Sequence, residues 1–246
     1  MNISKDWFVK WFDSPYYPIL YKNRNNSEAE LFILKLLSHI QLPQNAQILD
    51  LACGRGRHAL VMSQREEFQV TGIDLSENSI SDALKLAKHN LHFFVHDMRN
   101  VFKKNSFDLV TNLFTSFGYF ETLTEDCQVI EAVFQNLKPN GLFVIDYLNC
   151  EKVVGCLPIK EEKSIDSIQF SIDKYIEDDF IFKLIKIRDR EKVFNFAEKI
   201  RIYKKSYLSE LILKSGFSIV DVFGNYNLDT FEASTSDRIV ILAQKK

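Results

Sequence analysis

The chain has 246 residues, 46% hydrophobic and 26% charged, with a net charge of −2 and both signs interspersed, so a nucleic-acid partner is not expected. This length is enough to bury a sizeable core, and the longest apolar runs are far short of the roughly 20 residues of a membrane span. The amino terminus mixes charge and Trp too early for a secretion signal, and we therefore expect a cytoplasmic protein.

A regular alternation of strands and helices is predicted from residue 47 onwards, preceded by a helix over residues 28–41. Strands are predicted over residues 46–51, 68–74, 91–97, 107–114 and 142–148, and helices over residues 57–66, 77–90 and from Thr124 to residue 137. Ser76 is the predicted cap of the second of these helices. Strands that are apolar on both faces and alternate with amphipathic helices indicate a parallel sheet covered on both sides.

The alternation stops after residue 150. Three runs rich in Ile, Phe and Tyr follow, over residues 167–177, 179–189 and 192–203, and the polar links between them are short. Such links suit antiparallel hairpins, whereas parallel strands need long crossovers. A helix over residues 206–217 and strands over residues 218–224 and 238–244 complete the chain. The sequence therefore predicts one α/β domain with a small antiparallel insert.

A glycine-rich turn follows the first strand of the predicted sheet. The segment from Gly54 to Ala59 fits the pattern G-x-G-x-x-A, and Asp74 ends the second strand 18 residues past Gly56. Ligands of doubly wound sheets bind outside the carboxyl ends of the strands, where this turn lies. On spacing alone, the turn fits a dinucleotide site.

Asp50, just before the turn, argues against a dinucleotide. A carboxylate within ~4–6 Å of a pyrophosphate would oppose its binding by about 1–4 kcal/mol. S-adenosylmethionine has no phosphate, and both its ammonium and its sulfonium are cationic. Asp50 therefore favours S-adenosylmethionine over a nicotinamide dinucleotide.

Four segments in succession, "LDLACGRGRH", "GIDLS", "HDMR" and "LKPNGLFVID", resemble the ordered motifs of class I S-adenosylmethionine-dependent methyltransferases. The resemblance covers roughly residues 45–150, the final helix and the last two strands. It implies a Rossmann-like methyltransferase fold, doubly wound, with a mainly parallel seven-stranded sheet and a small antiparallel β insert. It also implies S-adenosyl-L-methionine as the cofactor. No metal is expected, because the cysteines and histidines lack the spacing of metal ligands.

The resemblance also assigns cofactor contacts to the ends of the strands. Ala52 departs from the glycine that many members have there, yet Ala is small enough for close approach. Singly, Asp50 and Asp97 could instead cap turns, and Asp74 could cap the Glu77 or Asn78 amides. The implied contacts are Asp50, Ala52, Cys53, Gly54 and Gly56 at the methionine end, Asp74 and Leu75 at the ribose, Asp97 and Met98 at the adenine, and Asn112, Leu113 and Phe114 under the sulfonium.

Related enzymes close an aromatic amino-terminal segment over the bound cofactor. By that analogy Tyr21 or Arg24 reaches the methionine carboxylate, although the segment could equally be a flank packed against the core. We expect one domain over residues 1–246. Its parts are a helical lid or flank (1–42), a cofactor-binding core (43–150 and 205–246) and the antiparallel insert (151–204).

The substrate is expected beside the segment "LFTSFGYF", which follows the fourth strand. Its aromatic residues suit a wall for an apolar or cationic small molecule, or could simply pack under a neighbouring helix. In related enzymes the insert roofs the active site. The candidate substrate contacts are Tyr16, Phe117, Tyr119, Tyr147 and Asn149.

Two residues are candidates for a general base. His58 lies in the first turn of the helix after the glycines, where a surface or capping role is an alternative. Glu198 is a charge on an otherwise apolar strand face, which requires either an ion-pair partner or a pocket.

The four cysteines form no C-x-x-C pair, and the histidines show no metal-ligand spacing. We expect a small-molecule O- or N-methyltransferase that works as a monomer or homodimer, without a nucleic-acid or membrane partner. The rival hypotheses are an NAD-linked oxidoreductase and a non-catalytic cofactor-binding module.

Overall fold

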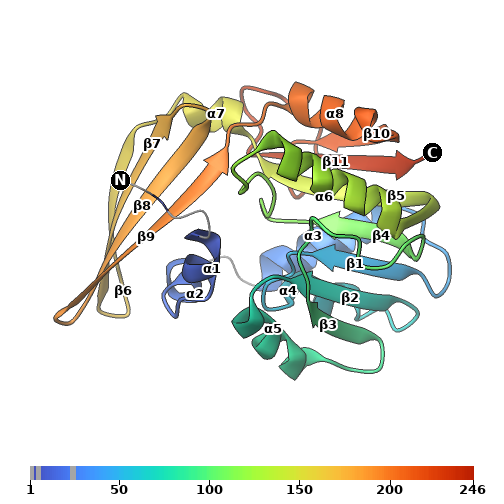
Figure 1. Ribbon diagram of the computed structural model, residues 1–246, viewed down its shortest axis with the longest axis horizontal. Coiled ribbons are helices and arrows are strands. Elements are labelled where there is room, and N and C mark those ends of the chain that lie inside the picture. The colour runs from blue at the N-terminus through green and yellow to red at the C-terminus, as the bar shows by residue number, and fades with distance from the viewer. Residues whose placement is uncertain (1–2, 4–6, 23–25) are drawn as a thin grey trace.

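The computed structural model describes residue 3 and residues 7–22 and 26–246. Within that part of the chain, the main sheet has seven strands in the order β10-β11-β5-β4-β1-β2-β3 (Figure 1). Its strands are β1 (Gln47–Leu51), β2 (Gln69–Asp74), β3 (Leu91–Val95), β4 (Phe107–Asn112), β5 (Leu137–Leu148), β10 (Phe217–Phe223) and β11 (Arg238–Lys245). Only β11 pairs antiparallel with both of its neighbours, so the predicted doubly wound, mainly parallel sheet is confirmed.

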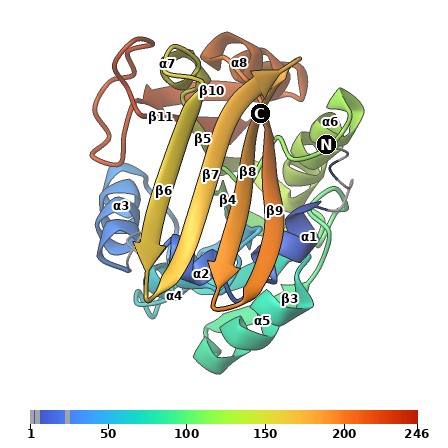
Figure 2. The ribbon, with the colours of Figure 1, turned by 90° about the vertical axis from the view of Figure 1, so that its left-hand side faces the viewer.

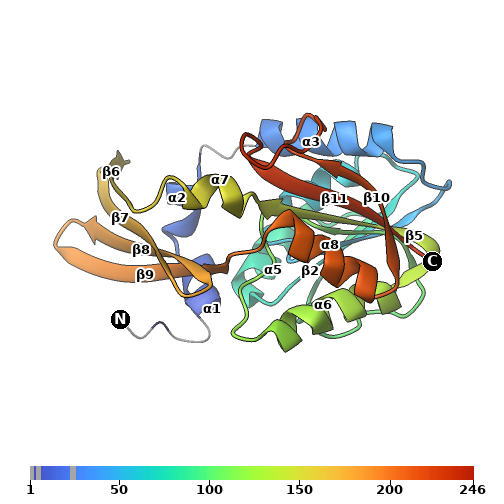
Figure 3. The same cartoon turned by 90° about the horizontal axis from the view of Figure 1, so that it is seen from above.

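Helices cover both faces of the main sheet (Figure 3). The helices of one face are α3 (Asn26–His39), α4 (Arg57–Met62) and α5 (Glu77–Ala83), which continues as a 3-10 turn (Leu84–Leu86), and those of the other face are α6 (Leu123–Asn136) and α8 (Lys205–Lys214). On β1, Ile48 packs with the first set and its neighbour Leu49 with the second, as the alternation of side chains in a strand requires. No helix in the described ranges has the length and apolar character to cross a membrane.

The insert forms a second, four-stranded antiparallel sheet, which follows β5 and the short helix α7 (Cys150–Val154). Its strands are β6 (Ile159–Ile165), β7 (Ile168–Glu177), β8 (Phe180–Asp189) and β9 (Lys192–Arg201). The sequence predicted the last three and missed β6. Charged residues fill most of the segment "IKEEKSI", which therefore lacks an apolar alternation; β6 lies at the edge of its sheet, where charges are common.

The helices α1 (Trp7–Phe12) and α2 (Tyr17–Leu20) lie between the insert and the main sheet (Figures 1 and 2). Trp7, Trp11 and Tyr16 are buried against the inward face of the insert, which presents Phe170 and Ile185 among other apolar side chains. The amino-terminal region is therefore divided, because α1 and α2 pack on the insert while α3 packs on the main sheet.

Helix α6 begins at Leu123, one residue before the predicted start at Thr124. Thr122 is its N-cap: the Thr122 hydroxyl accepts a hydrogen bond from the Glu125 N–H (3.3 Å), and the Glu125 carboxylate accepts one from the Thr122 N–H (3.1 Å). This reciprocal arrangement is a capping box.

We expect Thr122→Ala to lower the free energy of unfolding by about 1 kcal/mol, because it removes the side-chain cap. The measurement is urea denaturation. Thr124→Ala, an exposed position within the first turn, is the matched control and should leave stability nearly unchanged. Equal effects of the two substitutions would contradict the assignment of the cap.

Candidate functional site

The turn after β1 adopts a backbone that favours glycine. Ala52, Gly54 and Gly56 all have positive φ, at 53°, 54° and 81°. A Cβ on Gly56 would lie 2.6 Å from Cζ of Phe93, so both its conformation and its surroundings require glycine there. At Ala52 the left-handed backbone costs roughly 1–2 kcal/mol, which explains why glycine suits this position.

Asp74, at the end of β2, ties this turn to the start of α5. One of its carboxylate oxygens accepts a hydrogen bond from the Gly54 N–H (2.8 Å) and the other from the Ser76 N–H (2.8 Å). Burial raises the pKa of Asp74, against the effect of these backbone hydrogen bonds. A carboxylate has further lone pairs beyond these two, so it retains the capacity to accept hydroxyl groups. Ser76 caps α5, as predicted.

A first cavity of about 880 Å³, including its open mouth, lies over the carboxyl ends of β1, β2 and β4. It gathers many of the predicted cofactor contacts, and the amino-terminal helices form part of its wall. The lining residues are Phe8, Phe12, Tyr17, Ala52, Gly54, Arg55, Asp74, Leu75, Ser79, His96, Asp97, Met98, Phe114, Ser116, Tyr119 and Phe120. The other predicted contacts of this region, Asp50, Cys53, Gly56, Asn112 and Leu113, lie behind this wall.

Asp50 is a buried carboxylate with one unsatisfied oxygen. Only 1% of the residue is exposed; Oδ1 accepts a hydrogen bond from the Thr111 hydroxyl (2.8 Å), and Oδ2 has no hydrogen-bond partner among the described residues. Burial raises the pKa of Asp50 to about 7. The charge of Asp74 adds to this effect, while the Thr111 hydrogen bond, the charge of Arg57 and the Ala59 N–H oppose it. A buried carboxylate that keeps a raised pKa despite these partners is costly to ionise, and a cationic guest would reduce that cost.

A second unsatisfied acceptor lies on the neighbouring strand. Asn112 is buried, and in the described part of the chain its Oδ1 has no hydrogen-bond partner, while its Nδ2 donates to the Leu51 carbonyl (3.4 Å). Leu51 and Asn112 are register partners across β1 and β4. Two acceptors without donors at one sheet edge fit a guest that carries hydrogen-bond donors, as the amino-acid end of S-adenosylmethionine does.

Asp97 projects into the first cavity and is held by a residue that sequence reasoning missed. The Arg99 guanidinium donates to both carboxylate oxygens of Asp97, from Nε to Oδ1 (3.1 Å) and from Nη2 to Oδ2 (2.6 Å), and also donates to Glu125 (2.7 Å). Although burial opposes it, the hydrogen bonds and charge of Arg99 lower the pKa of Asp97. Asp97 is thus ionised and fixed in direction. Arg99 is the last residue of the motif "HDMR", two positions after Asp97, so the sequence did contain a signal for this partner.

The loop after β4 contains a turn that non-glycine residues rarely adopt. Phe114 and Thr115 both have positive φ, at 65° and 60°, and one is bulky and the other β-branched. Asp146 on β5 holds this turn: its carboxylate accepts from the Phe114 N–H (2.7 Å), and its carbonyl accepts from the Thr115 N–H (3.0 Å). Backbone strain of this kind persists only where the surroundings enforce it.

Arg238, the first residue of β11, completes this clamp. Its Nε donates to Asp146 (2.8 Å), and its Nη2 donates to the Thr115 hydroxyl (2.7 Å). The Tyr226 hydroxyl donates to the same Asp146 carboxylate (2.9 Å). A buried ion pair with a full set of hydrogen bonds therefore fixes the aromatic wall of the first cavity.

A second cavity of about 1350 Å³, including open solvent, adjoins the first and lies under the insert. Four aromatic residues, Phe12, Tyr17, Phe114 and Tyr119, line both cavities. The rest of its lining comes from the amino-terminal segment, the loop after β4, the end of β5, α7, the insert and the start of β11: Trp7, Leu20, Tyr21, Thr115, Leu148, Val153, Glu161, Lys163, Ile172, Lys174, Ile181, Lys183, Glu198, Ile200 and Arg238. Tyr119, one of the candidate substrate contacts, thus lies at the boundary between the two cavities.

Glu198 lines the second cavity and binds the amino-terminal segment to the insert. Its Oε1 accepts hydrogen bonds from the Trp11 indole N–H (2.8 Å) and the Tyr21 hydroxyl (2.6 Å), and Lys183 lies 3.5 Å away. The sequence left two explanations for this buried charge, an ion-pair partner or a pocket. Glu198 has both, because Lys183 is its partner and the second cavity lies beside it. Tyr21 itself lines the second cavity and not the first. Arg24 lies outside the described residues.

Three expected substrate contacts lie in the core instead. Tyr147 is fully buried and donates to the Arg201 carbonyl (2.6 Å), and Phe117 packs beside it. Asn149 is also fully buried, where it caps α7 and donates to the Ala233 and Ser236 carbonyls. These side chains have no access to either cavity, because internal hydrogen bonds and packing use them fully.

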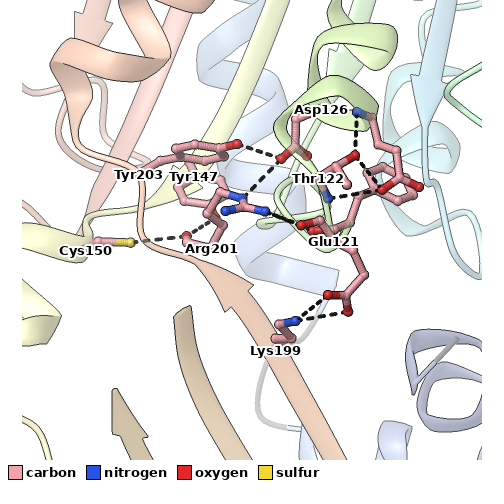
Figure 4. Close-up of polar contacts among 10 residues, drawn as sticks. Glu121, Thr122, Asp126, Tyr147, Cys150, Lys199, Arg201 and Tyr203 are labelled. Carbon is pink, nitrogen blue, oxygen red and sulfur yellow. Dashed lines mark hydrogen bonds and ion pairs between the residues drawn. The ribbon is translucent and has the colours of Figure 1, made fainter. Parts of the chain in front are cut away.

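Figure 4 shows the polar network that occupies this part of the core. Asp126 is buried, accepts a hydrogen bond from the Tyr203 hydroxyl (2.6 Å) and lies 3.5 Å from the Arg201 guanidinium. Arg201 also donates to the Glu121 carbonyl (2.7 Å), and Glu121 pairs with Lys199 (2.8 Å). The network joins β9 of the insert to the loop before α6 and has a structural role.

The two remaining candidates also lie outside the cavities. Tyr16 is buried between α2 and the insert, and its hydroxyl donates to Asp189 (3.0 Å). Burial lowers the pKa of His58 to about 3, and the charge of Arg57 adds to this effect. A neutral imidazole with so low a pKa is a weak proton acceptor at physiological pH.

Comparison with known proteins links this site to a family. A family model described as a methyltransferase domain matches residues 42–198. The chain is similar to the Bacillus subtilis (strain 168) protein YqeM, which carries a methyltransferase name, with 28% identity over 214 residues (83% of this chain and 86% of that protein). It is 30% identical over 132 residues, or 53% of this chain and 54% of the relative, to a dTDP-3-amino-3,4,6-trideoxy-alpha-D-glucopyranose N,N-dimethyltransferase of Streptomyces venezuelae.

A solved structure shares the whole architecture. The S-adenosylmethionine-dependent methyltransferase from Clostridium acetobutylicum ATCC 824 superposes with a TM-score of 0.79, covering 94% of this chain and 96% of that one. At 23% sequence identity, this likeness is one of fold.

Proposed function

Because the chain belongs to the methyltransferase domain family, we propose that it methylates an oxygen or nitrogen atom of a small molecule. It is an S-adenosylmethionine-dependent enzyme of class I. The unpartnered Oδ2 of Asp50, buried behind the glycine turn, is the observation that carries the assignment of the cofactor site. That oxygen suits the ammonium of the cofactor and would repel a pyrophosphate.

S-adenosylmethionine, when bound, supplies a methyl group already activated by its sulfonium. The protein then has to bind the cofactor, orient an acceptor and exclude water. In this proposal Asp74 accepts the ribose hydroxyls and Asp97, fixed by Arg99, accepts the adenine amino group. The acidic character of the first cavity supports both roles.

The second cavity is the proposed acceptor site. It adjoins the first cavity through four shared aromatic residues, so an acceptor there would meet the methyl group at this aromatic wall. The relative from Streptomyces venezuelae is named for methylating the amino group of a small sugar, which supports a small-molecule acceptor. Of the two base candidates only Glu198 lines a cavity, and the proposal therefore retains Glu198 alone.

The test combines binding and turnover. We expect calorimetry to show binding of S-adenosylmethionine and not of a nicotinamide dinucleotide. A methyl-labelled cofactor should then transfer its label to members of a panel of small O- and N-nucleophiles. Binding without transfer to any acceptor would favour a non-catalytic binding module, and failure to bind S-adenosylmethionine would overturn the proposal.

A substitution that fills the second cavity should separate its role from that of the first. We expect Ile200→Trp to lower turnover at least tenfold while the affinity for S-adenosylmethionine changes less than threefold, because Ile200 lines only the second cavity. Val193→Trp, on the same strand but 48% exposed, is the control and should change neither. Equal turnover of the two variants would exclude the second cavity as the acceptor site.

The proposal also includes a cytoplasmic location and a monomeric or homodimeric state. The thiols of Cys53, Cys127, Cys150 and Cys156 are all free, which suits a reducing compartment such as the cytoplasm. A monomeric or homodimeric state can be measured by analytical ultracentrifugation of the full chain.

A further inference from the structure

The two cavities differ in the sign of their charge. The first is lined by the carboxylates of Asp74 and Asp97, with Asp50 behind its wall, and carries Arg55 at its rim. Among the described residues that line the second cavity, cations exceed carboxylates by four to two. These charged residues are Lys163, Lys174, Lys183, Arg238, Glu161 and Glu198.

Two of these lysines, Lys174 and Lys183, lie side by side on the inward face of the insert. Lys174 and Lys183 are register partners across β7 and β8, and Glu198 is the next partner across β9. The same face is apolar further along these strands, where Ile172 and Ile185 are buried. Like charges directly opposite each other destabilise a sheet, and only 28% of the Lys174 side chain and 13% of the Lys183 side chain are exposed.

The carboxylates of the cavity do not offset all of this positive charge. Glu161 serves two lysines, Lys163 at 2.9 Å and Lys174 at 2.5 Å, and the hydrogen bonds of these lysines lower the pKa of Glu161 to about 2. Glu198 lies 3.5 Å from Lys183. Arg238 is paired with Asp146, which lies behind the wall. Among the residues that the structure describes, these four cations still exceed the three carboxylates by one when Asp146 is included.

We propose that the second cavity binds a methyl acceptor that carries an anionic group, a carboxylate or a phosphate, at Lys174 and Lys183. This inference rests on the proposed function and narrows the acceptor to one class. The anionic group lies against the insert, and the methylated atom points to the aromatic residues that both cavities share. Lys174 and Lys183 are then residues that determine specificity.

The experiment uses the full chain saturated with S-adenosylhomocysteine and titrates it with aromatic probes by calorimetry. Benzoate and phenyl phosphate carry the two anions, and benzamide and benzylamine are a neutral and a cationic counterpart. We expect at least one anion to bind tenfold or more tightly than benzamide and benzylamine. The tighter of the two anions identifies which group the site prefers.

Variants then locate the binding site. We expect Lys174→Met and Lys183→Met each to weaken binding of that anion about ten- to a hundredfold, because each removes a hydrogen bond to a charged group. Lys174→Arg keeps the charge and should restore binding to within about threefold. Lys186→Met, on β8 but exposed on the outward face, is the matched control and should bind as the unmodified chain does. Lys174→Met keeps the Glu161 ion pair with Lys163 and serves as the test should Lys183→Met fold poorly.

Two results would overturn the inference. One is that neither anion binds more tightly than benzamide, and the other is that both methionine variants bind the anion as well as the Lys186→Met control does. Binding of S-adenosylhomocysteine, measured first, distinguishes these results from failure of the proposed function. If the chain binds S-adenosylhomocysteine but shows no preference for anions, the inference about the acceptor fails and the proposed function stands.

Discussion

Asp50→Asn should weaken the binding of S-adenosylmethionine roughly ten- to 150-fold, the value of a hydrogen bond to a charged group. The amide keeps an oxygen for the Thr111 hydroxyl but removes the negative charge that faces the cofactor's cation. Calorimetry at pH 7.5 is the measurement. Asp108→Asn, at the opposite end of β4 and paired with Lys138, is the control and should leave affinity unchanged.

The same residue gives the affinity a pH dependence. The pKa of Asp50 is about 7 without cofactor, so its ionised fraction falls as pH is lowered through 7. We expect the affinity of the unmodified chain to fall about tenfold per pH unit below 7, and that of Asp50→Asn to stay nearly constant. An Asp50→Asn variant that binds the cofactor as tightly as the unmodified chain would refute the electrostatic account of the site.

As pH is lowered through 7, the affinity for the cofactor should fall, but the free energy of unfolding of the cofactor-free chain should rise. In the folded chain the pKa of Asp50 is raised from 3.8 to about 7, so the folded state holds this proton more tightly than the unfolded state does. The resulting stabilisation is complete below pH 3.8 and is lost as pH rises through 7, by on the order of 4 kcal/mol. Urea denaturation should therefore show Asp50→Asn gaining stability relative to the unmodified chain between pH 5 and pH 8.

Arg238→Met should lower the free energy of unfolding by about 3–5 kcal/mol, the cost of leaving one partner of a buried ion pair uncompensated. Asp146 is fully buried, and of the hydrogen bonds described for its carboxylate those with the Phe114 N–H and the Tyr226 hydroxyl would remain. The strained turn at Phe114 and Thr115 would also lose the Arg238 contact to Thr115. Thermal denaturation should show a decrease of about 10 °C in Tm.

Two further variants distinguish the ion pair from general damage. Arg188→Met, exposed on β8, should leave Tm within about 1 °C of the unmodified chain. The double variant Asp146→Asn with Arg238→Met removes both charges and should be more stable than Arg238→Met alone. A decrease below 1 kcal/mol for Arg238→Met would show that the pair does not hold the turn.

The sequence predicted the main sheet well because most of its strands have a cluster of buried apolar residues, as in Ile48, Leu49 and Leu51 of β1 and Phe143–Ile145 of β5. The sequence also predicted that Asp74, Asp97 and the glycine turn lie at one edge of the sheet, because the carboxyl ends of parallel strands meet at the same edge. It failed where residues far apart in the chain come together. Arg238 lies 92 residues from Asp146, and no local pattern links them.

The errors near β5 have a related cause. Tyr147 and Asn149 follow the strand at the productive edge, but alternation along a strand does not say what covers each face. The structure covers both residues, Tyr147 under Arg201 and Asn149 under the loop before β11. The pairing of Lys174 with Lys183 was missed because it depends on the register between β7 and β8, which the pattern of a single strand does not reveal.

The placement of α1 has a practical consequence for spectroscopy. The chain contains two tryptophans, and both lie in this one short helix. Trp7 lines the second cavity, and the Trp11 indole is bound to Glu198 on the insert. Fluorescence excited at the long-wavelength edge of the indole band, where the nine tyrosines absorb little, therefore comes from α1, beside the second cavity. The emission spectrum is a label-free optical signal for that single location.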